Sequence, residues 1–319
     1  MNQLKNKTVL VTGGTGFVGS HLVEALAEQG ARVIATYQSI DPQSYFSTQS
    51  LGSKAIMTPV DIVDFDRLFD IITKWEVDFI YHLAAQPLVE AAYYHPTRTL
   101  DTNIRGTISV LESARRYPHV KGVIFASSDK AYGKIDTDTK YTEESPLRGD
   151  HPYEVSKSAA DLIVNSYYKT YHVPAVTTRF GNIYGEGDLN FSRIIPGIMA
   201  SIIDNKPLDI RSDGTFVRDY LYVKDVVRGY LMLADHMDKA IGQAFNFGSN
   251  DTLSVLDLLT QIEKTLGKEV QKNILNQAKN EIPYQSLNFD KIQSAIGWKP
   301  ESTVQSTAQG IFEWYSKRS

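Results

Sequence analysis

The sequence predicts an α/β fold, a doubly wound parallel sheet followed by a smaller C-terminal lobe that binds substrate. Two observations predict it. Buried strands alternate with amphipathic helices through the first half of the chain, which is typical of parallel strands with helices on both faces of the sheet. A glycine-rich turn at 13–19 joins the first strand to the first helix. The 319 residues, 42% of them hydrophobic, are enough to bury a large core and to form two lobes.

The N-terminal half supplies the elements in order. Thr8–Val11 is an apolar run that predicts a buried strand, and the apolar spacing of 22–27 predicts a helix that ends at Gly30. We expect further strands at 32–37, 55–60, 77–81 and 122–127, with helices at 64–75 and 97–117. Ligands of such sheets bind beyond the carboxyl ends of the strands, where the segments 61–62, 82–86 and 127–130 follow.

The glycine-rich turn predicts a Rossmann-type dinucleotide site. Gly13, Gly16 and Gly19 would allow a tight turn, close approach of the backbone to a pyrophosphate, and close packing of helix on strand. The phosphates would lie at the positive end of the helix that begins near Phe17 and Val18. An ordinary glycine-rich turn is the alternative.

The end of the second strand favours NAD over NADP. The segment 35–38 lacks the acidic residue that usually binds the NAD ribose. It also lacks an arginine or lysine that would bind a 2′-phosphate. We therefore expect NAD as the cofactor.

A tyrosine and a lysine at helical spacing predict a catalytic pair. Tyr153 and Lys157 are four residues apart, so on a helix they lie on one face, where an ammonium can stabilise a tyrosinate. A phenol with a pKa near 10 is only about one part in a thousand ionised at neutral pH, so a nearby cation is needed to make it a useful base. The chain has 18 tyrosines, and a solvated helix face is the alternative.

Composition excludes several classes of function. The net charge of −4 gives no case for binding nucleic acid or an anionic membrane surface. The chain has no cysteine, which excludes disulfides and thiol nucleophiles, and the spacing of its seven histidines predicts no metal site. No secretion signal precedes the first strand, and no apolar run approaches the roughly 20 residues of a membrane helix. We expect a cytoplasmic enzyme.

These motifs resemble those of the extended short-chain dehydrogenase/reductases that act on nucleotide sugars, and the resemblance covers essentially the whole chain. The family's Asp-hydrophobic pair after the third strand matches Asp61-Ile62, and its Leu-Ala-Ala segment matches Leu83 to Ala85. Its catalytic hydroxyl, four residues before a Tyr-Gly pair, falls on Ser128. The resemblance implies a cofactor site made of Gly13, Gly16, Phe17, Val18, Gly19, Asp61, Ile62, Leu83, Ala84, Ala85, Asn103, Tyr153 and Lys157.

Within this family, the two residues after the catalytic hydroxyl, here Ser128, distinguish epimerases from 4,6-dehydratases. Epimerases usually carry small neutral residues there, whereas 4,6-dehydratases carry an acid and a second ionisable group; this chain has Asp129-Lys130. Together with the segment 82–87, Ser-Asp-Lys is most similar to the CDP-glucose 4,6-dehydratase branch, as are 179–182 and 187–188. The segment 218–223 resembles the dTDP- and UDP-sugar enzymes instead, so the nucleotide stays open.

These side chains suit oxidation followed by elimination. Tyr153 would take the C4 hydroxyl proton while hydride passes from C4 to the nicotinamide, with Ser128 hydrogen-bonded to the forming ketone. Lys130 would then remove the acidified C5 proton while Asp129 protonates the departing C6 hydroxyl, and hydride returned to C6 would give a 4-keto-6-deoxy sugar. These roles need the neutral forms of Asp129 and Lys130, which free-solution pKa values disfavour by about 9 kcal/mol. Burial would narrow that gap, and a surface ion pair is the alternative.

The second half is expected to bind the nucleotide-diphosphate sugar. We expect a strand at 173–180, helices at 191–203, 223–233, 253–266 and 303–315, an NAD-binding domain at 1–181 with a return segment near 222–248, and a substrate lobe at 182–221 and 249–319. The resemblance implies that Asn182, Arg193 and Arg218 hold the diphosphate, which the planar fork of arginine suits, and that Gln86 contacts substrate.

The long helices 97–117 and 153–172 are the elements that related enzymes use to form dimers, so we expect a homodimer. The leading interpretation is a nucleotide-sugar 4,6-dehydratase of polysaccharide biosynthesis. A nucleotide-sugar epimerase or 4-ketoreductase of the same fold is the alternative, and a noncatalytic cofactor-sensing protein is the third.

Overall fold

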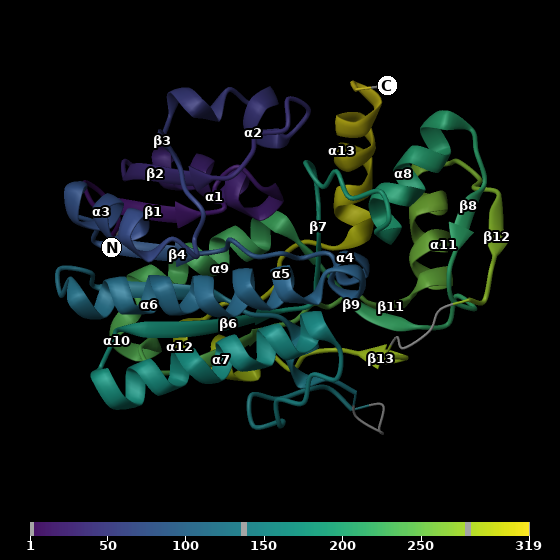
Figure 1. Cartoon of the computed structure of the whole chain (residues 1–319). Helices are drawn as coiled ribbons and strands as arrows, with labels where there is room; N and C mark the ends of the chain where they lie inside the picture. Colours follow the sequence, from purple (N-terminus) through teal and green to yellow (C-terminus); the bar gives the residue numbers. More distant parts are fainter. Residues whose placement is uncertain (1–2, 135–138, 278–281, 319) are drawn as a thin grey trace.

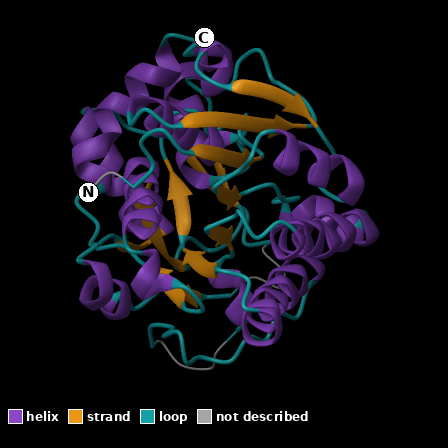
Figure 2. Cartoon of the chain, turned by 90° about the vertical axis from the view of Figure 1, so that its left-hand side faces the viewer, coloured by secondary structure: helices purple, strands orange, loops and turns teal. Residues whose placement is uncertain are grey.

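The computed structural model describes residues 3–134, 139–277 and 282–318. Its centre is a seven-stranded parallel sheet with the strand order β3-β2-β1-β4-β5-β6-β10 (Figures 1 and 2). The strands are β1 Thr8–Thr12, β2 Arg32–Tyr37, β3 Ile56–Pro59, β4 Phe79–His82, β5 Gly122–Ala126, β6 Ala175–Phe180 and β10 Ala244–Phe247. The order reverses between β1 and β4, and this is the point at which such sheets bind dinucleotides. The predicted doubly wound α/β fold is confirmed.

Helices cover both faces of the sheet because successive strand residues point to opposite sides. Val9 and Val11 pack in the cluster that contains the apolar side chains of α1 and α9, whereas Leu10 packs in the cluster that contains those of α3, α6 and α7. These helices are α1 Phe17–Glu28, α3 Phe65–Lys74, α6 Gly106–Arg116, α7 Pro152–Tyr171 and α9 Val223–Asp235. The two hydrophobic layers enclose the sheet, and the carboxyl ends of the neighbouring parallel strands β1, β4 and β5 lie at one edge of it. The site forms at this edge.

A second lobe lies beside the sheet, with its own apolar core (Figure 1). Its strands are β7 Asn182–Tyr184, β8 Leu208–Ile210, β9 Val217–Tyr222, β11 Thr252–Ser254, β12 Lys272–Ile274 and β13 Tyr284–Gln285. Its longer helices are α8 Ile194–Asp204, α11 Val255–Leu266 and α13 Val304–Ser316, and their buried faces form the third core cluster with side chains of β8 and β9. Among the described helices, none combines the length and the apolar character needed to cross a membrane.

Shorter elements complete the chain. They are α2 Tyr45–Thr48, α4 Val89–Tyr94, α5 Pro96–Leu100, α10 Met237–Ala240, α12 Asp290–Ile296, and single turns at Leu51–Ser53 and Asp129–Tyr132. The expected helix 97–117 is not continuous, because a π-helical turn at Asp101–Arg105 separates α5 from α6. The expected helix 253–266 begins with a strand, and β9 was not expected at all.

Candidate active site

The turn after β1 is built for close contacts. Gly13 has φ +67°, and a Cβ on Gly19 would lie 2.2 Å from the carbonyl oxygen of Gly13, so only glycine lets α1 pack this closely on the turn. Helix α1 then begins at Phe17 after an extended Gly16, and no described side chain caps its first amides. These amides lie at the positive end of the helix and can therefore bind an anionic ligand.

A buried hydrogen-bonded chain links this turn to the neighbouring strand. Thr107 Oγ1 donates to the carbonyl of Asn103 (2.6 Å), so Nε2 of His82 donates to Thr107 (3.1 Å), and Nδ1 accepts from Thr12 Oγ1 (2.8 Å). The same Thr12 oxygen accepts the amides of residues 83 and 84. Burial, and then the charge of Lys157, lowers the pKa of His82 to about 3, so this imidazole stays neutral. Sequence reasoning did not give His82 this role.

Asn103 joins the cofactor segment to the catalytic helix. Its Oδ1 accepts the amide of Gln86 (2.8 Å), and its Nδ2 donates to the Gln86 carbonyl (3.2 Å) and to Ser156 Oγ (2.8 Å). Ser156 in turn donates to the carbonyl of Tyr153 (2.6 Å). The π-helical turn is what brings this side chain, 3% exposed, into that position. Direct contact of Asn103 with the cofactor stays a prediction.

The other residues predicted at the cofactor site lie along the same sheet edge, and their side chains contact protein groups. Asp61 Oδ1 accepts the amide of Val63 (3.1 Å), and Ile62 packs against Gly106, where a Cβ would lie 2.5 Å from it. Leu83 packs on the core beside α1, and Ala84 lies against Gly13. Phe17 and Val18 pack their side chains against the core of the second lobe, which leaves their amides at the helix start.

The turn after β5 places three polar side chains together. Ser128 Oγ donates to Asp129 Oδ1 (3.0 Å), and Lys130 Nζ lies 3.6 Å from the same oxygen. The Asp129 side chain is only 3% exposed and that of Lys130 is 24% exposed, so this is not a surface ion pair. Lys130 Nζ also donates to Asn182 Oδ1 on β7 (3.5 Å). An acid, an amine and a hydroxyl therefore share one half-closed site.

Tyr153 lies at this site, with its hydroxyl hydrogen-bonded to Ser128. The surrounding protein raises the pKa of this phenol rather than lowering it. Burial, and then the charge of Asp129, raises the pKa of Tyr153 to about 12, although Arg193 and Ser128 act in the opposite direction. Lys157 Nζ donates instead to the carbonyl of Ala126 (2.8 Å), and burial lowers its pKa to about 8. The protein groups alone thus favour a neutral phenol.

The predicted substrate residues divide into two groups. Asn182 and Arg193 belong to the site: Asn182 accepts from Lys130, and the charge of Arg193 acts on Tyr153. Asp188 holds Arg193 with one oxygen at 3.0 Å. Arg218 donates instead to the carbonyls of residues 217 and 283, and Gln86 Oε1 accepts the amide of Leu88.

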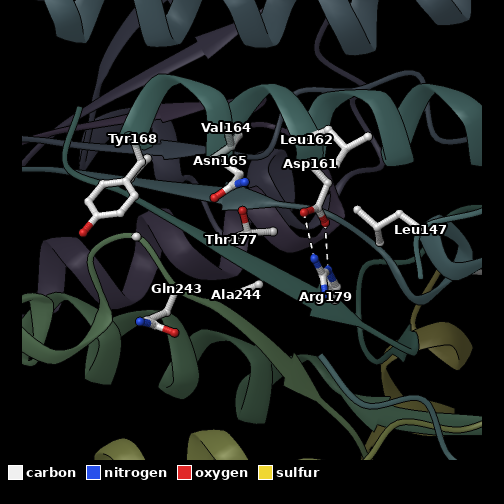
Figure 3. Close-up of a pocket in the computed structure, with 12 residues that line it drawn as sticks. Leu147, Asp161, Leu162, Val164, Asn165, Tyr168, Thr177, Arg179, Gln243 and Ala244 are labelled. Atoms are coloured by element: carbon white, nitrogen blue, oxygen red, sulfur yellow. Dashed lines mark hydrogen bonds and ion pairs between the residues drawn. The ribbon is translucent and has the colours of Figure 1, made fainter. Parts of the chain in front are cut away.

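Beneath the turn lies a buried ion pair that sequence reasoning missed. Arg179 on β6 binds Asp161 on α7 through two hydrogen bonds of 2.8 Å (Figure 3). Asp161 is eight residues after Tyr153 and four after Lys157, so the helical spacing that marked the Tyr/Lys pair already placed it on the same face. Across 3–134, 139–277 and 282–318, no cluster of three or more His, Asp or Glu side chains could hold a metal ion.

Comparison with known proteins shows the family of the chain. A family model described as the NAD dependent epimerase/dehydratase family matches residues 9–248. The chain is 29% identical to the CDP-glucose 4,6-dehydratase of Salmonella typhimurium, over 98% of this chain and 92% of that protein. Its fold matches dTDP-glucose 4,6-dehydratase from Bacillus anthracis in complex with NAD (TM-score 0.86, 27% identity, 98% and 97% of the two chains). It also matches UDP-glucose 4-epimerase from Thermotoga maritima with UDP-glucose (TM-score 0.88, 28% identity, 97% and 99%). The predicted resemblance is confirmed, and the chain belongs to the NAD dependent epimerase/dehydratase family.

Proposed function

We propose that the protein is a nucleotide-sugar 4,6-dehydratase, a hydro-lyase that converts an NDP-hexose to an NDP-4-keto-6-deoxyhexose. The observation that carries the proposal is the pair Asp129–Lys130, with Lys130 Nζ 3.6 Å from Asp129 Oδ1 and next to the hydroxyls of Ser128 and Tyr153. An epimerase has no water to eliminate and no need for an acid and an amine here. The dehydratases among its relatives support the same reaction.

The cofactor is NAD, as predicted, and the glycine-rich turn fits it. A Cβ on Gly16 would meet one described atom within 4 Å beyond its chain neighbours, Gly13 O at 3.3 Å, so the backbone there is open to a phosphate. Gly13, Gly16 and Gly19 would hold the pyrophosphate with the first amides of α1, and the 83–85 segment would contact the nicotinamide half. Bound there, NAD would supply a hydride acceptor for C4 and a hydride donor for C6, and its positive charge would favour the tyrosinate.

Tyr153 acts on the C4 hydroxyl. It takes the hydroxyl proton while Ser128 turns its single hydroxyl proton from Asp129 to the forming ketone, and later turns it back. The hydrogen bonds from Tyr153 to Ser128 and from Ser128 to Asp129 form a continuous line. The proton that Tyr153 accepts can therefore pass through Ser128 to Asp129. It replaces the proton that Asp129 gives to the leaving hydroxyl.

Asp129 and Lys130 carry out the elimination. Lys130, as the neutral amine, takes the C5 proton while Asp129 protonates the C6 hydroxyl, and water leaves. Lys130 later returns a proton to C5. The sugar thus loses one water in all, and every protein group regains its starting proton. Asn182 holds Lys130 through its side-chain oxygen, which keeps the amine near the turn.

The diphosphate is the group that Arg193 and Asn182 are placed to bind. Arg193 is 40% exposed, its charge reaches Tyr153, and Asp188 fixes one side of its fork. We also assign Arg218 to the diphosphate and Gln86 to the sugar, which needs Arg218 to exchange its two backbone carbonyls for phosphate oxygens. The domain division at 1–181 with 222–248, and 182–221 with 249–319, belongs to the same proposal.

We propose a cytoplasmic homodimer that acts in polysaccharide biosynthesis. Apolar side chains are exposed on α4 and α7, among them Tyr94 (84% exposed), Leu162 (56%) and Tyr171 (54%). Exposed apolar side chains on neighbouring helices are typical of an interface. Sedimentation at micromolar concentration would then give twice the chain mass of 35.7 kDa.

Incubation with CDP-, dTDP-, UDP- and GDP-hexoses tests the function. A dehydratase gives a product that is lighter by one water, for at least one nucleotide. A product of unchanged mass, inverted at one carbon, would make the protein an epimerase. In a separate incubation with an NDP-4-keto-6-deoxyhexose, loss of the ketone with consumption of added reductant would make it a 4-ketoreductase.

A further inference from the structure

The ion pair between Asp161 and Arg179 reaches both ends of the catalytic turn. At the entry, Ser127 Oγ donates to Asp161 Oδ2 (2.9 Å). At the exit, Arg179 NH1 donates to the hydroxyl of Tyr132 (2.7 Å), and the guanidinium lies 4.9 Å from the centre of the Tyr132 ring. Ser128, Asp129 and Lys130 lie between these two attachment points.

The same pair also fixes the catalytic helix. Asp161 lies on α7 two turns after Tyr153, and Arg179 lies on β6, the strand next to the β10 edge of the sheet. The helix, the strand and the turn therefore meet at one carboxylate. Asp161 also opposes, through its charge, the lowering of the Lys157 pKa by burial.

Fold stability alone does not account for an ion pair at this place. Both side chains are at most 6% exposed, and a buried pair of charges costs so much desolvation that apolar residues of similar volume often stabilise a protein as well. What apolar residues cannot supply is direction. The two hydrogen bonds between Arg179 and Asp161 fix the orientation of both side chains. This sets the direction in which Asp161 accepts from Ser127 and in which Arg179 donates to Tyr132.

We infer that Asp161 and Arg179 are positioning residues that hold both ends of the catalytic turn against Tyr153. They contact no reacting atom. They act through Ser127 and Tyr132, and Tyr132 is itself held by a hydrogen bond to Asn246 Oδ1 (2.7 Å). The inference rests on the proposed function, because the turn that they hold carries the elimination residues.

A cavity gives access to the pair from the other side. It has a volume of about 150 Å³ and is lined from α7, β6 and the segment before β10, with Asn165, Thr177 and Tyr168 among its polar side chains (Figure 3). Arg179 and Asp161 form part of its wall. A small planar cation could therefore enter and take the place of a missing guanidinium.

Tyr132→Phe is the first test, because it cuts the link to the turn and leaves the ion pair intact. We expect kcat for dehydration to fall about tenfold with KM unchanged, since misplacement by about 1 Å can cost up to a hundredfold. Arg179→Ala should lose about a hundredfold and regain at least tenfold with millimolar methylguanidinium, but not with methylammonium. Arg67→Ala, which removes an exposed arginine on α3, should keep wild-type activity.

Hydrogen exchange separates positioning from fold stability. In Tyr132→Phe, the amides of 127–133 should exchange faster than in the wild type, while those of β1 stay unchanged. Unchanged exchange at 127–133, or an equal rise in β1, would overturn the inference. The same holds if Arg179→Ala turns over at the wild-type rate or is rescued equally by both cations. Exchange needs no substrate, so it tests this inference even if no NDP-hexose loses water and the proposed function fails.

Discussion

The oxidation at C4 is expected to accelerate with pH up to about 8 and then to level off. Burial lowers the pKa of Lys157 to about 8, and burial with Asp129 raises that of Tyr153 to about 12. Below pH 8 both groups are protonated. Between pH 8 and 12 the pair holds one proton, and the active form, ammonium with tyrosinate, holds the same number. Its population therefore rises with the loss of the first proton, whichever group carries the remaining one.

The magnitude follows from these two values. With a first pKa of about 8, about 1% of the pairs have lost a proton at pH 6 and half of them at pH 8, so the rate should rise about 50-fold over this range. The height of the plateau is set by an energy gap between two forms of the pair. The pKa values of Tyr153 and Lys157 differ by about four units, which places the ammonium–tyrosinate form about 5 kcal/mol above the form in which both groups are neutral.

Single-turnover formation of reduced cofactor, followed by its near-ultraviolet absorbance at saturating NAD, measures this step. Lys157→Met is the matched variant. Without the lysine, the first proton lost is that of Tyr153, so the rate should keep rising tenfold per pH unit through pH 9 without a plateau. A wild-type profile that is flat from pH 6 to 8, or a Lys157→Met profile that levels off at the same pH, would refute the reasoning.

Three further predictions concern the base, the cofactor turn and the redox balance. Tyr153→Phe should lower kcat by at least about a hundredfold and leave NAD affinity, measured by calorimetric titration, unchanged. Gly19→Ala should lower stability by about 1–3 kcal/mol, seen as a lower Tm, because its Cβ would lie 2.2 Å from Gly13 O. Gly16→Ala should have a Tm close to that of the wild type but should bind NAD more weakly. Equal NAD affinity in both variants and the wild type would exclude this turn as the pyrophosphate site. The wild type should convert substrate without added reductant and without accumulating free NADH, and a stoichiometric need for NADPH would contradict the redox-neutral reaction.

Much of the fold could be predicted because its signals are local. The expected helix 64–75 is α3, Phe65–Lys74, whose first turn is capped by the Asp64 side chain. The strand expected at 32–37 is β2. The placement of Ser128 and Asp129 at the sheet edge followed from the strand pattern, since the carboxyl ends of parallel strands share one edge. Tyr153 was assigned to the same site from its spacing with Lys157 and from the family resemblance.

The remaining features depend on distant contacts. The π-helical turn at 101–105 is tied to the hydrogen bonds of Asn103 with residues 86 and 156, which no local pattern shows. β9 was missed because Val-Arg-Asp-Tyr-Leu-Tyr mixes charged and aromatic residues, and Asp219 is buried there only by accepting from Ser286, Thr252 and the Leu287 amide.

The pKa of Tyr153 could not be predicted from the sequence, because it also depends on distant contacts. Its spacing from Lys157 suggested stabilisation of the tyrosinate, but the amine donates to the carbonyl of Ala126, and the charge with the largest effect on the Tyr153 pKa is that of Asp129. Burial, which has no signature in the spacing, is the largest cause of the shift.

The most direct test of the central claim, that Asp129 and Lys130 carry out an elimination, is a single turnover with Lys130→Met. Bound reduced cofactor and product mass are followed together, with the NDP-hexose that the wild type converts. We expect that reduced cofactor forms and persists while no product lighter by one water appears, and that wild-type product made in D2O carries deuterium at C5. Loss of water by Lys130→Met at the wild-type rate would contradict the account, because another group would then be the base.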